Sequence, residues 1–250
     1  MNHFFKTIIL ILAGCVLVNC QSAPKPGYVE QPHVVKKREQ LRERLLNLLP
    51  DDKRKKSAAI REAGWLADTA YKSAAAIARY NDPVFVNWLN NRAVNTRRSF
   101  RQRGLCWHYQ HDLYRELRRR PLQYFKLGCC VRDKGKGGEH HVVYVMDKEG
   151  SWPHLVMLDA WWYSGRLKVD GEEEAEEWED DSKASDKLNE FYPEGHRLPM
   201  EHWAMIRRGT RYVDYIYSNT PEARKTEQWQ YMQQQMKQGM KRRKGKPTDY

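Results

Sequence analysis

The hydrophobic pattern of the chain changes near Gly104, and this change constrains the fold more than any other feature. In residues 36–49 and 57–80, apolar side chains recur at steps of three and four, the period of an amphipathic α-helix. After one more helical stretch at 106–119, short runs rich in β-branched and aromatic residues take over. Helices and strands in separate blocks predict an α+β domain with an antiparallel sheet.

The strand pattern predicts the order of the sheet segments and a weakly structured acidic region. The expected strands cover residues 122–131, 140–146, 155–159, 165–169 and 211–217. Asp82 and Pro83 are expected to cap and start another helix, which fades near residue 97. Residues 170–186 are dominated by Glu and Asp, so we expect a solvated loop or a short exposed helix there.

The N-terminus has the pattern of an export signal. Residues 7–18 form a 12-residue apolar run, too short for a membrane span, which needs about 20 residues. Such a run fits the apolar core of a signal peptide. Cys20 is the favoured lipidation site because a polar tether follows it, and Cys15 is the alternative because small residues precede it. We therefore expect an exported lipoprotein anchored to a membrane and facing the periplasm or the cell exterior. An ordinary cleaved signal or a plain membrane anchor is the competing interpretation.

The chain carries a net charge of +12, concentrated in residues 36–44, 53–56 and 237–246. A basic surface can meet anionic lipid, nucleic acid or polyanionic polymers of the cell envelope. A simply solvated surface is the favoured interpretation, and a nucleic-acid partner is not favoured.

These patterns divide the chain into four parts. We expect a signal peptide (1–19), a tether (20–35), one main domain with a helical N-terminal part (36–219) and a polar helix with a basic tail (220–250).

The first candidate catalytic segment is Gly104-Leu105-Cys106-Trp107-His108. A cysteine at a helix start lies beside unpaired N–H groups and the positive end of the helix dipole. This setting lowers the pKa of a thiol from about 8.5 and favours the nucleophilic thiolate. The same N–H groups can hold the oxyanion that forms when a carbonyl is attacked. His108 and His111 are interpreted as structural, and Cys129 and Cys130 as small buried strand residues.

Two further segments supply a base and a carboxylate. His140 begins one expected strand, and Asp159 ends another. An aspartate can hydrogen-bond the far nitrogen of an imidazole and fix its tautomer, so a nucleophile, a base and an orienting group are all present. Trp107 and Trp161 are candidates for the wall of a cleft, with ordinary packing as the alternative.

In order and context, these segments resemble the transglutaminase-like (papain-like) cysteine enzymes. The resemblance covers roughly residues 62–169 and extends to bacterial transglutaminase-like lipoproteins. It is carried by Gly104-Leu105-Cys106, by Glu139-His140 with Val142-Val143, and by Leu158-Asp159 with Trp161. It implies N-terminal helices and a nucleophile helix packed on a small antiparallel sheet. It also implies Cys106 as nucleophile, His140 rather than the adjacent His141 as general base, and Asp159 as the orienting residue.

The resulting hypothesis is a cell-envelope cysteine hydrolase or acyltransferase acting on peptide or amide bonds, with a peptide or protein substrate. No motif implies a cofactor, and no Cys-x-x-Cys pair suggests a metal site. The alternative is a non-catalytic binding or scaffold lipoprotein that keeps the fold, since a fold alone does not define a function. A polyanion-binding protein using the basic tail is a third, weaker interpretation.

Overall fold

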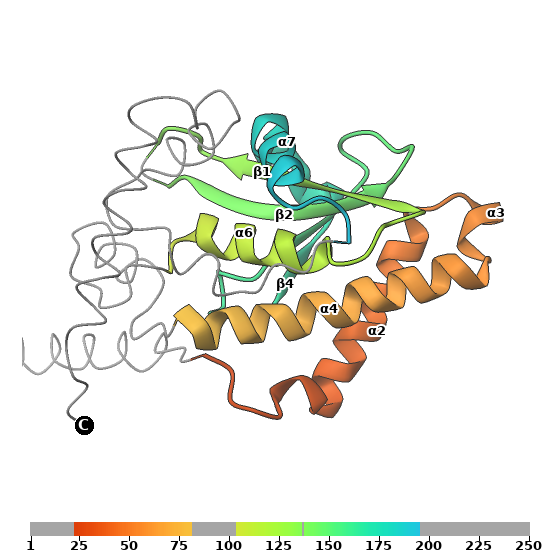
Figure 1. Ribbon diagram of the computed structural model, residues 1–250, viewed down its shortest axis with the longest axis horizontal. Helices are drawn as coiled ribbons and strands as arrows, with labels where there is room; N and C mark the ends of the chain where they lie inside the picture. The colour runs from red at the N-terminus through yellow and green to blue at the C-terminus, as the bar shows by residue number, and fades with distance from the viewer. Residues whose placement is uncertain (1–22, 82–103, 137, 196–250) are drawn as a thin grey trace, which may run out of the picture.

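The computed structural model describes residues 23–81, 104–136 and 138–195, which contain helices and an antiparallel sheet (Figure 1). The α+β class predicted from the sequence is confirmed. Both candidate lipidation cysteines, the helix expected after Pro83, the strand at 211–217 and the C-terminal tail lie outside the described residues. Within the described ranges, no helix combines the length and hydrophobicity needed to cross a bilayer.

The sheet has five strands in the order β4-β3-β2-β1-β5, and every neighbouring pair is antiparallel. The strands are β1 (Phe125–Arg132), β2 (His140–Asp147), β3 (Val156–Asp159), β4 (Lys168–Asp170) and β5 (Glu179–Asp180). In register, Val143 of β2 lies opposite Leu158 of β3. Three of the expected strands therefore form the centre of the sheet, as their β-branched content indicates.

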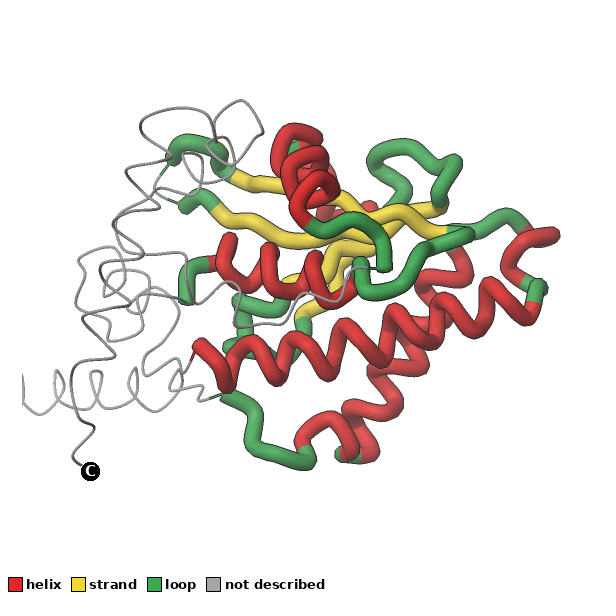
Figure 2. Tube along the Cα trace, viewed as in Figure 1, coloured by secondary structure: helices red, strands yellow, loops and turns green. Residues whose placement is uncertain are grey.

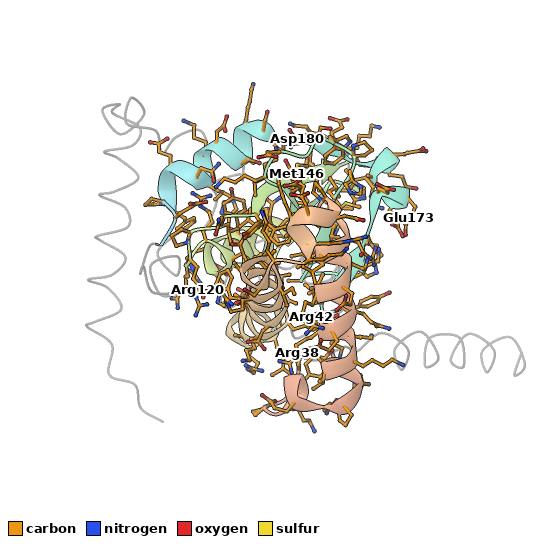
Figure 3. All side chains as sticks on the ribbon, turned by 90° about the vertical axis from the view of Figure 1, so that its right-hand side faces the viewer. Arg38, Arg42, Arg120, Met146, Glu173 and Asp180 are labelled. Carbon is orange, nitrogen blue, oxygen red and sulfur yellow. The ribbon has the colours of Figure 1, made fainter. Side chains whose placement is uncertain are left out.

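The larger helices pack on one side of this sheet. The helical elements are η1 (Tyr28–Glu30), α2 (Pro32–Asn47), α3 (Asp51–Arg54), α4 (Ser57–Asn81), α6 (Cys106–Leu117), η2 (Glu172–Glu177) and α7 (Ser182–Phe191). Helix α6 contacts both β2 and α4, and α2 packs on α4 (Figures 1 and 2). Arg38 and Arg42 on α2 consequently lie far below Asp180 and Met146 of the sheet in Figure 3.

Side chains alternate between the two faces of the sheet, as the two-residue period of a strand requires. Cys129, Val143 and Leu158 join the core formed with the helices, and small alanines let α4 approach closely. On the opposite face, Cys130 and Val142 pack with Trp178 in a second cluster. Both faces are thus covered, and β1 and β2 are buried on both sides.

The interpretation of residues 170–186 as a solvated stretch with little to bury was partly wrong. The Glu side chains of η2 are exposed, but Ala175 and Trp178 are buried against the sheet. Residues 179–180 add the edge strand β5, and Asp181 caps α7 by accepting a hydrogen bond from the Ala184 N–H. The few apolar residues of this stretch are spaced so that they cover the second face of the sheet. The acidic composition of the stretch as a whole gave no indication of this burial.

Gly165 fixes the connection between β3 and β4 against α4. Its φ is +88°, and an added Cβ would lie 2.3 Å from the Ala78 Cβ and 2.8 Å from the Ala74 carbonyl oxygen. Gly135 has a similar φ of +76° but no heavy atom within 4 Å of such a Cβ. Left-handed backbone alone costs an L-residue about 1–2 kcal/mol. We expect Gly165→Ala to lower the free energy of unfolding in urea by about 2 kcal/mol more than Gly135→Ala, because only Gly165→Ala also overpacks the core. Equal losses would contradict this packing role.

Candidate active site

Helix α6 begins at Cys106, and the turn before it is held by a histidine. Leu105 has an extended backbone, with φ −73° and ψ 155°. The His108 Nδ1 accepts hydrogen bonds from the N–H groups of Gly104 (3.2 Å) and Leu105 (3.1 Å). The Trp161 indole donates a 2.8 Å hydrogen bond to the Gly104 carbonyl. These bonds fix the position of Cys106 from two directions.

The role of His108 goes beyond the general structural part that the sequence suggested. It occupies the third position of the helix, from which a polar side chain reaches back to N–H groups at the helix start. Because Nδ1 accepts two hydrogen bonds, the proton of a neutral His108 is on Nε2. The signal in the sequence was a polar residue at the third position of the expected helix.

Cys106 lies at the edge of the core. It is 5% exposed, and its thiol is 3.9 Å from the Glu139 carbonyl oxygen, the residue directly before β2. Among the described residues, nothing accepts a hydrogen bond from the Cys106 backbone N–H. This N–H at the helix start is the type of donor that can stabilise an oxyanion.

His140 and Asp159 form a buried pair. The His140 Nε2 is 2.7 Å from the Asp159 Oδ2, and both side chains are about nineteen-twentieths buried. Extending the β2–β3 register places Val142 opposite Asp159. His140 is two residues before Val142, so it lies on the same face of the sheet as Asp159 and is its diagonal neighbour. The sequence predicted this meeting of two strands, and the antiparallel register explains it.

Asp159 is held in place by both of its oxygens. While Oδ2 contacts His140, Oδ1 accepts hydrogen bonds from the N–H groups of Trp161 (2.8 Å) and Trp162 (3.0 Å). The tight turn after β3 supplies these two donors. A carboxylate with both oxygens engaged cannot rotate freely, so it fixes the direction of the imidazole.

The second ring nitrogen of His140, Nδ1, is buried. Nδ1 has no hydrogen-bond partner of regular geometry among the described residues, but the Cys106 side chain is close enough to affect the charge of the ring. Asp159 and Cys106 thus both contribute to the charge state of the His140 ring. Of the three residues that the sequence proposed for catalysis, His140 and Asp159 are in direct contact, and Cys106 lies near enough to contribute to the raised pKa of His140.

Aromatic rings enclose His140. The ring centroids of Trp161, Trp162 and Trp178 lie 5.0, 5.6 and 5.6 Å from that of His140. Trp161, predicted as a cleft wall, is thus a neighbour of His140. Trp107, the other candidate, is buried and packs against His108 and His111 within α6. Trp178 lay in the acidic stretch and was not anticipated.

The surroundings of His140 favour its charged form. Burial lowers the pKa of His140, but the charge and hydrogen bond of Asp159, followed by the contribution of Cys106, raise it to about 9. An imidazole that keeps a proton near neutral pH can stabilise a neighbouring thiolate, as required for cysteine nucleophiles.

The raised pKa of His140 predicts a pH-dependent stability. The folded value of about 9 exceeds the unfolded value of 6.5, so the folded state binds the proton more tightly. The resulting stabilisation, about 3 kcal/mol, is complete below pH 6.5 and is lost as the pH rises through 9. Urea unfolding of the wild type and of His140→Gln checks this. We expect their difference in unfolding free energy to shrink between pH 6 and pH 9.5, and a constant difference would contradict it.

The neighbouring histidine belongs to a different arrangement. His141 Nε2 is 2.7 Å from the Glu139 Oε1, and this hydrogen bond lowers the pKa of Glu139 more than burial raises it. His141 is buried and belongs to the other face of the strand. Of the two candidates for the base, only His140 is paired with Asp159.

The other described cysteines have no comparable surroundings. Cys129 and Cys130 are fully buried free thiols in β1, as predicted, and burial raises the pKa of each well above its usual value. In the ranges 23–81, 104–136 and 138–195, no group of three or more His, Cys, Asp or Glu could hold a metal ion. No protein-family model, curated protein or solved structure matches the chain.

Proposed function

We propose that the protein is a cysteine hydrolase or acyltransferase that acts on peptide or amide bonds through an acyl-thioenzyme. The observation that carries this proposal is the buried His140–Asp159 pair, which lies near the Cys106 side chain. A nucleophile, a base and an orienting carboxylate, each on a rigid element, form the arrangement that covalent acyl transfer requires.

In the proposed first half-reaction, the Cys106 sulfur attacks the carbonyl carbon of the substrate, and a carbon–sulfur bond forms. The oxyanion is stabilised by the Cys106 N–H. When the intermediate collapses, the carbon–nitrogen bond breaks, and protonated His140 donates its proton to the leaving amine. Asp159 keeps the imidazole oriented throughout and stabilises its positive charge.

In the second half-reaction, His140 takes a proton from the acceptor, which attacks the thioester and releases Cys106. Water as acceptor gives hydrolysis, and an amine gives transamidation. We further propose a transglutaminase-like fold, supported by the α+β architecture and by α6 lying between the sheet and α4. An exported, lipid-anchored protein acting on envelope peptides fits the N-terminal pattern.

Trapping the acyl-enzyme tests the proposal. The full-length protein is incubated with an activated ester of an N-acylated glycine, quenched in acid and digested, and the Cys106 peptide is analysed by mass spectrometry. We expect the acyl mass on Cys106, its loss in Cys106→Ala, and its transfer to added glycine amide if the enzyme is a transferase. Acylation of Cys106 that is unchanged in His140→Ala would overturn the mechanism.

The same experiment separates catalysis from a scaffold role. Cys106 is only 5% exposed and His140 only 3%, which would suit a non-catalytic protein that keeps the fold. A scaffold would give no acyl adduct in the wild type. Burial alone does not decide between them, because reactive groups in enzymes are often shielded from water.

A further inference from the structure

A cavity with a volume of about 710 Å³ lies apart from the three proposed catalytic residues, between the segment before α2, one face of α2 and the β3–β4 connection. Small-molecule sites typically have volumes of about 300–1,000 Å³. None of the described residues that line it is Asp or Glu, whereas Lys and Arg come from all three walls. The cavity is thus of ligand size and strongly basic.

The positive charges come from separate segments that converge on the cavity. Lys25 precedes η1, Lys37 and Arg44 lie on α2, and Arg166 lies between β3 and β4. Lys37 and Arg44 are seven residues apart, so they share one face of the helix. A fifth cation, Lys168, is paired with Asp170 at 2.6 Å.

The basic side chains of α2 differ in whether they are paired with carboxylates. Arg38 is paired with Asp68, and Arg42 with Glu39 and Glu43, and neither arginine lines the cavity. Among the described residues, Lys25, Lys37 and Arg44 pair with no carboxylate, although Arg44 donates to the Val169 carbonyl at 3.2 Å. Cations gathered without counter-charges are costly unless an anion offsets their repulsion.

Three tyrosines complete the walls. Tyr28, Tyr71 and Tyr163 come from η1, α4 and the β3–β4 connection. Burial, followed by the neighbouring Tyr28, raises the pKa of Tyr71 to about 12, although Arg44 opposes this. Its hydroxyl therefore stays protonated at neutral pH and can donate a hydrogen bond. The Arg166 guanidinium lies over the Tyr28 ring, 5.7 Å from its centre.

We infer that this cavity binds a ligand that carries a phosphate group, either a soluble phosphate ester or the headgroup of an anionic phospholipid. Arginine, lysine and hydroxyl donors that converge on a cavity with no Asp or Glu among its described lining residues match the several oxygens and the charge of a phosphate. The volume leaves room for a small polyol or sugar beside it, with the tyrosine rings as walls. The inference does not depend on the proposed catalysis.

The soluble arm of the test uses isothermal titration of the full-length protein with glycerol 3-phosphate. Lys25→Gln combined with Lys37→Gln removes two exposed charges from the cavity. Lys36→Gln combined with Lys56→Gln removes two exposed charges outside it. We expect the cavity variant to bind at least tenfold more weakly and the control variant to change by less than twofold. Cys106→Ala is expected to bind like the wild type, which keeps this result separate from the catalytic proposal.

The lipid arm compares vesicles of phosphatidylglycerol with vesicles of phosphatidylcholine. A preference for phosphatidylglycerol that only the cavity variant loses would identify a lipid headgroup as the ligand, whereas weakened glycerol 3-phosphate binding identifies a soluble ester. Loss of neither would overturn the inference. Equal losses in the cavity and control variants, or binding of acetate as tight as that of glycerol 3-phosphate, would also overturn it.

Discussion

Replacing His140 by alanine is expected to slow alkylation of Cys106 by iodoacetamide at pH 7 by about 30-fold. An ordinary thiol with a pKa of about 8.5 is only about 3% thiolate at pH 7, and the thiolate is the reacting species. The pKa of His140 is raised to about 9, so the imidazole is charged at pH 7, and a neighbouring cation favours the thiolate over the thiol. The rate is measured by mass spectrometry of the peptide that contains Cys106.

His141→Ala is the matched control for this experiment. His141 is the next residue on β2, is equally buried, and is paired with Glu139 instead of Asp159. We expect it to change the rate by less than threefold in protein that circular dichroism shows to be folded. A larger effect of His141→Ala than of His140→Ala would contradict the proposal that His140 is the base.

The second large effect is expected from Asp159→Ala, which should lower the free energy of unfolding by about 3–5 kcal/mol. Removing one partner of a buried ion pair leaves the other without compensation, and this cost is much larger than that of an exposed pair. Asp159 also accepts hydrogen bonds from Trp161 and Trp162, so the turn after β3 loses its support. Urea unfolding at pH 6, where His140 is charged, measures the change.

Asp68→Ala provides the comparison. Asp68 also has two cationic partners, Arg38 and Lys72, but its side chain is 39% exposed. Exposed ion pairs contribute only about 0–1 kcal/mol. If Asp159→Ala destabilised the protein no more than Asp68→Ala, the buried pair would not have the structural role described here.

Much of the fold could be predicted from periodicity. The helix at 57–80 and the strand at 140–146 were expected within about a residue of α4 and β2, because long regular patterns are the most reliable signals. Strand β5 could not be predicted, since it consists of two exposed acidic residues whose position depends on pairing with β1. The burial of Trp178 depends in the same way on tertiary contacts.

The residues of the candidate site could be predicted from the sequence, but the hydrogen bonds that hold them in place could not. A cysteine at a helix start, a histidine at a strand start and an aspartate at a strand end were recognisable individually, and the register of β2 and β3 joins the last two. The hydrogen bonds that His108 accepts from the turn before Cys106 depend on the side-chain geometry at the third position of the helix. The basic cavity joins residues up to about 140 positions apart, which no local pattern could connect.

If Cys106 is the nucleophile, folding should make its thiol more reactive, not less. The most direct test compares its iodoacetamide labelling at pH 7 in the folded protein and in guanidinium chloride, with the cysteines resolved by peptide mass. Burial alone should protect every described thiol, so Cys129 and Cys130 are expected to react more slowly when folded. Cys106 is expected to react faster folded than unfolded, despite being 5% exposed. Protection of Cys106 to the same degree as Cys129 and Cys130 would contradict the account.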